Sequence, residues 1–249
     1  MKFLLPILGL LSALSINAKE LTVVSYNIKH GVNMKGQLKL DDTASALSKL
    51  MPDVIALQEV DNETTRANKV AQTKYLADKL GMHHVFGKAI DLQGGGYGMA
   101  ILTKFPILEQ KVHRLPSVGE KRVALEVVVE PVKGKKMSFV CIHFDYASEK
   151  TRQPQIKTLL EALKSVKHPV VLFGDFNATP ESPSIALFKK DWYNVPKEGP
   201  SLTYPADEPK SEIDFFMLRG LKTKGLKCTV IGDKNTSDHR PLLLKFKIN

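Results

Sequence analysis

The chain has 249 residues, of which 43% are hydrophobic and 25% are charged, and its formal net charge at pH 7 is +10. This length and composition predict one globular domain with a large core, and they exclude a disordered or fibrous protein. The positive charge favours a phosphorylated or polyanionic partner, or an anionic membrane surface. The densest basic groups, 133–136 and 219–227, fall where hairpins or strand connections are expected, so a solvated loop is the simpler explanation of each.

The amino-terminal segment has the pattern of a secretory signal. A charged start, Met1-Lys2, precedes an apolar run over residues 3–16, and Asn17-Ala18-Lys19 follows. A small residue after such a run is typical of a cleavage site, and the run is short for a bilayer span. We therefore expect a cleaved signal, 1–18, and a single mature domain, 19–249, that is periplasmic or secreted, makes no stable membrane insertion and has no obligate protein partner.

Strands and helices alternate along the chain without a linker. In the strand with Val123, Leu125 and Val127 on one face, we place Glu126 on the opposite face. The glycine-rich stretch 94–96 is expected to be a mobile loop or bend, because it does not join a strand to a helix as a phosphate loop does. We predict strands at 21–26, 54–57, 99–102, 123–129, 139–142, 170–175, 213–218, 228–231 and 242–246, and helices near 42–50, 66–80 and 156–166.

Two parts of the chain share one pattern. A strand that ends at Asn27 is followed by a helix and a buried strand that ends at Glu59, and the same order leads from His143 to Asp175. Both pairs are 32 residues apart. We infer a weak internal repeat and expect two sheets packed face to face, with both rows of strand ends at one rim. Coincidence in an alternating α/β chain is the alternative.

The only cysteines, Cys141 and Cys228, lie in apolar, strand-like runs. They could pair in an oxidising compartment, and two buried free thiols fit equally well. The fold does not depend on a disulfide framework.

Polar side chains of catalytic type follow the predicted strands. Asp175 and Asn177 share a face if the chain is extended there, and a turn that caps the strand would explain them as well. Carboxylate and amide oxygens at such positions suit Mg²⁺ or Mn²⁺, and the chain has neither a zinc-type Cys/His spacing nor a Gly-x-Ser-x-Gly elbow. The residues at these strand ends are Asn27, Glu59, His143, Asp175, Asn177, Asp214, Asp238 and His239.

Six motifs in order resemble the endonuclease/exonuclease/phosphatase family. They are SYNIKHG (25–31), ALQEV (56–60), IHFD (142–145), GDFN (174–177), EIDFF (212–216) and SDHRPL (237–242). The resemblance spans essentially the whole mature chain. It implies an α/β (α+β) fold of four layers, in which two mixed β-sheets pack face to face with helices outside and the active site lies at the rim of the sheets.

The resemblance also implies a role for each residue. Glu59 would be the main metal ligand, with Asn27 and Asp238 near the same Mg²⁺ or Mn²⁺ ion. His143 and Asn177 would hold phosphoryl oxygens, and Asp175 would orient or deprotonate the attacking water. His239, paired with Asp214, would stabilise the developing charge or transfer a proton. These types suit in-line attack of water on phosphorus, which needs charge neutralisation more than a covalent nucleophile.

The motifs constrain the chemistry more than the substrate. We expect a Mg²⁺-dependent phosphodiesterase that favours nucleic acid, with candidate substrate-binding residues His30, Arg66, Tyr97, Arg122 and Arg152. For the arginines, a surface ion pair is an equal alternative. The same machinery acting on a lipid, a sugar or another small phosphoester is the first alternative function, and a polyanion-binding module without catalysis is the second.

Overall fold

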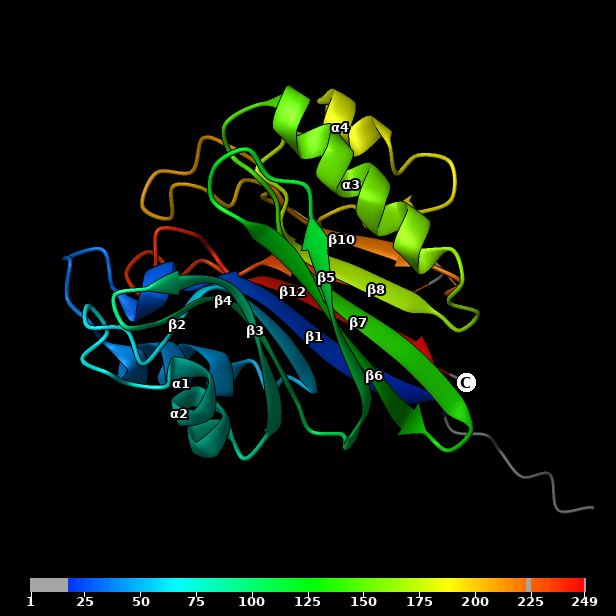
Figure 1. Cartoon of the computed structure of the whole chain (residues 1–249). Helices are drawn as coiled ribbons and strands as arrows, with labels where there is room; N and C mark the ends of the chain where they lie inside the picture. The colour runs from blue at the N-terminus through cyan, green and yellow to red at the C-terminus, as the bar shows by residue number, and fades with distance from the viewer. Residues whose placement is uncertain (1–17, 223–224, 249) are drawn as a thin grey trace, which may run out of the picture.

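Two six-stranded sheets pack face to face in the computed structural model, which describes residues 18–222 and 225–248 (Figure 1). The first sheet consists, in spatial order, of β11 (Lys227–Val230), β12 (Leu242–Ile248), β1 (Lys19–Asn27), β2 (Val54–Asn62), β4 (Gly95–Thr103) and β3 (His83–Leu92). The second consists of β5 (Ile107–Leu115), β6 (Arg122–Val132), β7 (Lys135–His143), β8 (Val170–Asp175), β10 (Asp214–Arg219) and β9 (Tyr193–Asn194).

Helices form the two outer layers. Figure 1 shows α1 (Leu40–Lys49) and α2 (Gln72–Leu80) on the outside of the first sheet, and α3 (Glu149–Leu163) and the short α4 (Pro183–Ala186) on the outside of the second. A 3₁₀ turn, η1 (Lys29–Gly31), follows β1. The four layers confirm the predicted α/β sandwich. The predicted signal segment lies outside the described residues, except for Ala18.

The central strands are apolar on both faces because each face is covered. In β1, Leu21 and Val23 point into the core between the sheets, whereas Val24 and Tyr26 pack toward α1 and α2. Burying a large apolar side chain contributes about 2 kcal/mol, so a strand with two covered faces is held firmly. The ends of these strands therefore form a rigid base for the polar side chains that follow them.

The inferred repeat agrees with the topology. β1 and β2 are parallel neighbours connected through α1, and β7 and β8 are parallel neighbours connected through α3. His143 pairs directly with Asp175, and Asn27 pairs with Gln58, next to Glu59. Because parallel strands end at the same edge of a sheet, each half brings two polar strand ends together.

The predicted end of β2 at Glu59 is wrong. The strand continues to Asn62, and its register with β4 shifts between Leu57 and Val60. Glu59 lies in this bulge and has a left-handed backbone, with φ of 54°. A bulge re-aims one side chain without ending the strand, so Glu59 can turn toward the rim while its neighbours stay in the ladder.

Two further local predictions need correction, and two long strands were not predicted. The predicted helix 66–80 begins only at Gln72, because Asn68 and Lys69 have positive φ angles and the chain turns there. The glycine-rich stretch is the start of β4, in the tight hairpin from β3. Strands β3 and β5 were not predicted, because their many polar residues hide the alternation.

Glu126, on the face of β6 opposite Val123, Leu125 and Val127, is buried. Its carboxylate accepts a 2.6 Å hydrogen bond from Ser138 Oγ and lies 2.7 Å from Nε2 of His113. Burial alone would raise the pKa of Glu126, but the contacts with His113 and Ser138 outweigh it and hold the pKa below its usual value. Glu126, in the valine-rich strand β6, therefore forms a buried polar cluster with His113 and Ser138.

Both cysteines are free and buried, and burial raises the pKa of each thiol to about 12. Within residues 18–222 and 225–248, no helix is long and apolar enough to cross a membrane.

Candidate active site

The strand ends of the two sheets surround a pocket of about 370 Å³. Its walls come from both sheets and from the loops between them. The residues that line the pocket are Glu59, Tyr97, Glu120, Arg122, His143, Tyr146, Asp175, Asn177, Tyr204, Ile213, Asp238 and His239. Asn27 and Asp214 are buried beside it. The structure thus brings together all eight predicted catalytic and metal-binding residues, which the sequence spreads over more than 200 positions.

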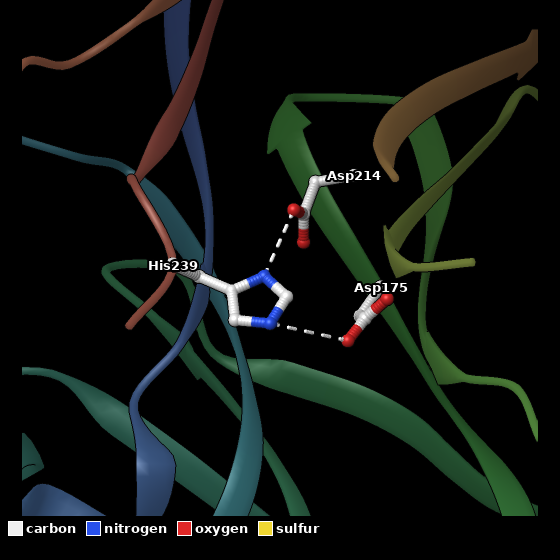
Figure 2. A group of neighbouring side chains, drawn as sticks. All are labelled: Asp175, Asp214 and His239. Carbon is white, nitrogen blue, oxygen red and sulfur yellow. Dashed lines mark hydrogen bonds and ion pairs between the residues drawn. The ribbon is translucent and has the colours of Figure 1, made fainter. Parts of the chain in front are cut away.

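His239 lies between two carboxylates (Figure 2). Its Nδ1 is 3.0 Å from Oδ2 of Asp214, and its Nε2 is 3.6 Å from Oδ2 of Asp175. Burial alone would lower the pKa of His239, but the charges of Asp214 and Asp175 outweigh burial and raise it to about 10. The ring is therefore an imidazolium at neutral pH, held in place through Nδ1 with Nε2 facing Asp175.

Asp175 and Asp214 come from adjacent antiparallel strands and face each other as direct partners in the β8–β10 ladder. Asp175 ends β8, where its side chain is almost completely buried. Burial raises the pKa of Asp175, and the charge of Asp214 raises it further, although the positive His239 opposes both. A carboxylate with a raised pKa is suited to accept a proton near neutral pH.

His143, at the end of β7, is held as a neutral imidazole. Nη1 of Arg122 lies 3.0 Å from Nδ1 of His143. A guanidinium can only donate, so Nδ1 accepts and the ring proton is on Nε2, which lies 3.5 Å from Asp175 Oδ2. Burial, together with the charge of Arg122, lowers the pKa of His143 well below its usual value. The two histidines of the site therefore differ in charge.

The second group of carboxylates consists of Glu59 and Asp238, with Asn27 behind them. Asn27 donates from Nδ2 to Glu59 Oε1 at 3.1 Å and to Asp175 Oδ2 at 3.2 Å, while its Oδ1 accepts from the backbone of Lys29. Asp238 Oδ2 is 3.1 Å from Nζ of Lys29. Burial raises the pKa of Glu59, against the bond from Asn27, so a nearby cation would be favourable there.

Asp175 also caps the turn that follows β8, as the simpler explanation proposed. Its Oδ1 accepts a 2.8 Å bond from the backbone of Asn177, whose φ is 49°. The chain is therefore not extended between these residues, and Asn177 reaches the pocket through this turn while its Nδ2 donates to the carbonyl of Phe144. Gly174 is required just before, since a Cβ there would lie 2.0 Å from the carbonyl oxygen of Ile142.

Two groups in the site could be considered for a divalent metal. Ligand atoms of Asp175, Asp214 and His239 all lie within 4.8 Å of one another. However, both nitrogens of His239 face carboxylates, and a protonated imidazole has no free lone pair to bind a metal. Glu59 and Asp238 instead offer hard carboxylate oxygens at the wall of the pocket, which is the kind of donor that Mg²⁺ or Mn²⁺ uses.

The predicted substrate-binding residues have different positions. Tyr97 and Arg122 line the pocket. Arg66 is held just beyond it by a bidentate contact with Asp61, at 2.7 and 2.8 Å, and its guanidinium lies 5.3 Å from the ring centre of Tyr97. His30 is half-buried next to Arg66, and burial followed by the Arg66 charge lowers its pKa.

The expectation for Arg152 is wrong. Its guanidinium is buried at the start of α3, where it donates to the carbonyl of Asp145 and to the side chains of Glu149 and Ser184. These contacts use its donors to fix the loop after β7 onto α3, and it does not line the pocket.

Sequence reasoning missed four residues of the pocket wall. Tyr146 and Tyr204 have 73% and 38% of their surface exposed, and the Tyr204 ring centre lies 4.9 Å from that of His239. Glu120 pairs with Arg122 at 3.1 Å, and Ile213 precedes Asp214. Tyr146 directly follows the IHFD motif, and Glu120 is two residues before Arg122. Closeness in sequence to predicted site residues was therefore the available signal that they line the pocket. Tyr204 has no such signal, since it lies ten residues before Asp214.

The fold and the site are those of a phosphoester hydrolase. The model of the Endonuclease/Exonuclease/phosphatase family matches residues 24–239. The chain therefore belongs to this family, whose members are phosphoester hydrolases that generally depend on a divalent metal, and the resemblance predicted from the six motifs is confirmed.

Individual proteins show the same relationship. YbhP from Escherichia coli strain K12 is 24% identical over 238 residues, which cover 88% of this chain and 93% of YbhP. A family protein from Bacteroides thetaiotaomicron has a similar structure, with a TM-score of 0.76 and 19% identity over 93% of this chain and 99% of that one. A mannosyl-6-phosphatase from B. thetaiotaomicron has a TM-score of 0.72 and 19% identity over 92% of this chain and all of that one. These similarities in structure support the fold.

Proposed function

We propose that the protein is an exported, Mg²⁺-dependent phosphodiesterase with nucleic acid as its favoured substrate. The observation that carries this proposal is the position of His239, an imidazolium fixed by Asp214 with Nε2 directed to Asp175 at the pocket. Export is proposed from the amino-terminal sequence pattern alone.

Each side chain of the site has a separate role in the in-line hydrolysis. Asp175 orients the attacking water and accepts its proton, because its pKa is raised and it faces the pocket. His239 stabilises the negative charge that develops on the phosphoryl oxygens and donates a proton toward the leaving oxygen from Nε2. The neutral His143 donates from Nε2–H to a phosphoryl oxygen, and the second amide hydrogen of Asn177 does the same.

Glu59 and Asp238 would hold the metal ion, with Asn27 orienting Glu59. When bound, Mg²⁺ neutralises phosphoryl charge and lowers the barrier to attack by water. Lys29 already balances the charge of Asp238, so binding the ion there requires its ammonium group to move or to share the carboxylate.

Two features support nucleic acid. The net charge of +10 attracts polyanions, and the exposed rings of Tyr146 and Tyr204 stand at the pocket wall. Aromatic rings beside a phosphate site provide surfaces on which bases stack, at about 1–3 kcal/mol per base.

A sugar phosphate is the second candidate, and Glu120 favours it. This carboxylate lines the pocket, where it would repel a further phosphate but could accept hydrogen bonds from sugar hydroxyl groups. The structural similarity to a mannosyl-6-phosphatase is consistent with a substrate of this size.

A direct comparison of substrates separates these candidates. Purified protein 19–249 would be incubated with supercoiled plasmid and with mannose 6-phosphate, with Mg²⁺ or with EDTA, alongside the His239→Ala and Glu120→Gln variants. Metal-dependent nicking that His239→Ala abolishes and Glu120→Gln retains supports the nuclease. Phosphate release without nicking, reduced by Glu120→Gln, supports the sugar phosphatase. Binding of plasmid without hydrolysis of either substrate would refute both.

A further inference from the structure

A second cavity, of about 710 Å³, lies at the other end of the sheets. Four segments that are distant in sequence form it: 134–137 at the β6–β7 turn, 167–169 before β8, 220–222 after β10, and 247–248 at the end of β12. In Figure 1 this is the end at which the C-terminus is marked. The two basic groups that the sequence assigned to separate solvated loops thus meet around one cavity.

The cavity is separated from the catalytic pocket by the length of a strand. β7 starts at Lys135, which lines the cavity, and ends at His143, which lines the pocket. Eight residue steps of an extended strand span roughly 26 Å. A small substrate in the pocket therefore cannot also occupy this cavity.

The rim of the cavity is strongly basic. Its lysines are Lys135, Lys136, Lys167, Lys222 and Lys247, and no carboxylate is among the described residues that line it. In the described part of the chain, Lys136 pairs with Glu109 at 3.3 Å, whereas no ion pair is found for Lys135, Lys167 or Lys247, which are all exposed. Holding these ammonium groups around one hollow raises the local positive potential, so an anion is attracted to it.

The inner surface of the cavity is apolar. Met137 and Ile248 are buried side chains of the core between the sheets, and the partly buried Leu221 packs against this core. Pro169 completes this surface. Apolar groups below a lysine rim match a ligand that has an anionic group joined to an apolar body, because lysine stems cover apolar surface while their ammonium groups stay in water.

The amino-terminal segment joins the fold at this same end. Lys19, the first residue of β1, pairs with Ile248 in the β1–β12 ladder. The apolar run over residues 3–16, which we expect to enter a membrane during export, is separated from Lys19 by two residues. Before cleavage, a membrane that holds this segment would therefore lie closest to the basic end of the domain.

We propose that this basic end binds the surface of a membrane that contains anionic phospholipids, with phosphate head groups at the lysine rim and an acyl or glycerol portion against Met137, Leu221 and Ile248. The domain then stands on the membrane with its catalytic pocket directed away from it. This proposal does not depend on the catalytic function, since it uses none of the residues of the pocket.

The test measures binding of protein 19–249 to vesicles by flotation. Vesicles of phosphatidylethanolamine with phosphatidylglycerol are compared with vesicles of phosphatidylcholine alone. We expect salt-sensitive binding to the anionic vesicles only. The triple variant Lys135→Gln, Lys167→Gln, Lys247→Gln should reduce partitioning on the order of 100-fold, since each lysine near an anionic surface contributes about fivefold.

The matched control carries the same charge change elsewhere. Lys49 on α1, Lys111 on β5 and Lys157 on α3 are exposed, and the triple change to Gln at these positions should reduce partitioning only about twofold. Circular dichroism verifies that both variants fold, and phosphodiester hydrolysis is measured in parallel.

Three outcomes would overturn the proposal. Equal losses of vesicle binding in the two triple variants would indicate an effect of net charge alone, and no loss of vesicle binding in the cavity variant would show that its lysines are not involved. Loss of duplex DNA binding in the cavity variant, with vesicle binding unchanged, would assign the cavity to nucleic acid. If hydrolysis is absent in every protein but vesicle binding follows the prediction, the catalytic proposal fails and this one stands.

Discussion

The guanidinium of Arg122 sets the position of the proton on His143, because Nη1 donates to Nδ1 over 3.0 Å and leaves the hydrogen on Nε2. Arg122 is buried, and its guanidinium also pairs with Glu120 at 3.1 Å. Arg122, at the start of β6, thus determines which ring nitrogen of His143, at the end of β7, carries the hydrogen.

Replacing Arg122 by Met should therefore reduce kcat more than it changes KM. Without the donor at Nδ1, His143 can take either tautomer or a proton, and losses of about 10- to 100-fold are typical when such an orienting partner is removed. The tautomer can be read directly from ¹⁵N chemical shifts of the ring. Lys121→Met is the control, since it removes one positive charge from the exposed neighbouring residue and leaves the Arg122–His143 bond in place. An unchanged Nε2–H tautomer and unchanged kcat in Arg122→Met would contradict this assignment.

The charge of His239 should depend on Asp214. In the native protein the two carboxylates raise the pKa of His239 to about 10, against the effect of burial. Asp214→Asn removes one of these charges and the hydrogen-bonded carboxylate at Nδ1, so the pKa of His239 should fall. An NMR titration of the ring resonances measures it. A pKa as high in Asp214→Asn as in the native protein would show that Asp214 does not hold the imidazolium.

Metal affinity separates the two possible ligand groups. Glu59→Gln should weaken Mg²⁺ binding by at least about 10-fold, because it removes a charged oxygen ligand, whereas Asp214→Asn should change it little. Isothermal titration calorimetry with Mg²⁺ alone provides the measurement without substrate. The reverse order of effects would place the ion at the group of Asp175, Asp214 and His239 instead.

Gly174 should not tolerate a side chain. Its φ is 148°, and a Cβ at this position would lie 2.0 Å from the Ile142 carbonyl oxygen, so β7 and β8 must separate in Gly174→Ala. We expect a loss of about 3 kcal/mol in the free energy of unfolding, measured with urea. Gly119→Ala is the control, since nothing lies within 4 Å of a Cβ there. Equal stability of the two variants would refute the predicted clash.

The buried Glu126 should make stability depend on pH. Because its folded pKa is lowered, its contribution is present above the unfolded pKa of about 4.3 and is lost as the pH falls through the folded value. Glu126→Gln should therefore lower the free energy of unfolding by about 1–2 kcal/mol at pH 7, where the carboxylate is charged and accepts hydrogen bonds from His113 and Ser138. The loss should be smaller near pH 3. A cost that does not change with pH would show that the carboxylate charge is not involved.

The sandwich and the composition of the site could be predicted from the sequence because both depend on strand ends. The apolar runs end at His143 and Asp175, which predicts that these side chains lie at the same edge of a sheet. The 32-residue repeat indicated two such sheets. The contacts within the site could not be predicted. The hydrogen bond from Arg122 to His143 exists because β6 and β7 are neighbours in the sheet. A single sequence does not give the order of strands in a sheet.

The errors have a similar origin. Glu59 was predicted to end a strand because a bulge leaves no local pattern that differs from a strand end. Arg152 was assigned to substrate because the sequence around it does not show that it is buried. Its partners Asp145, in the loop after β7, and Ser184, in α4, meet it only in the folded chain. Likewise, the lysines of the distal cavity are scattered along the chain and meet only in the folded protein.

Hydrolysis of bis(p-nitrophenyl) phosphate by protein 19–249 tests the central claim most directly, because this simple diester needs the catalytic groups but no particular substrate recognition. With Mg²⁺ we predict turnover that EDTA abolishes and that falls by at least about 100-fold in His239→Ala, while the distant Lys157→Gln variant matches the native rate. Folded protein that hydrolyses the diester equally well with EDTA, or equally well without His239, would contradict a metal-dependent site built around this histidine.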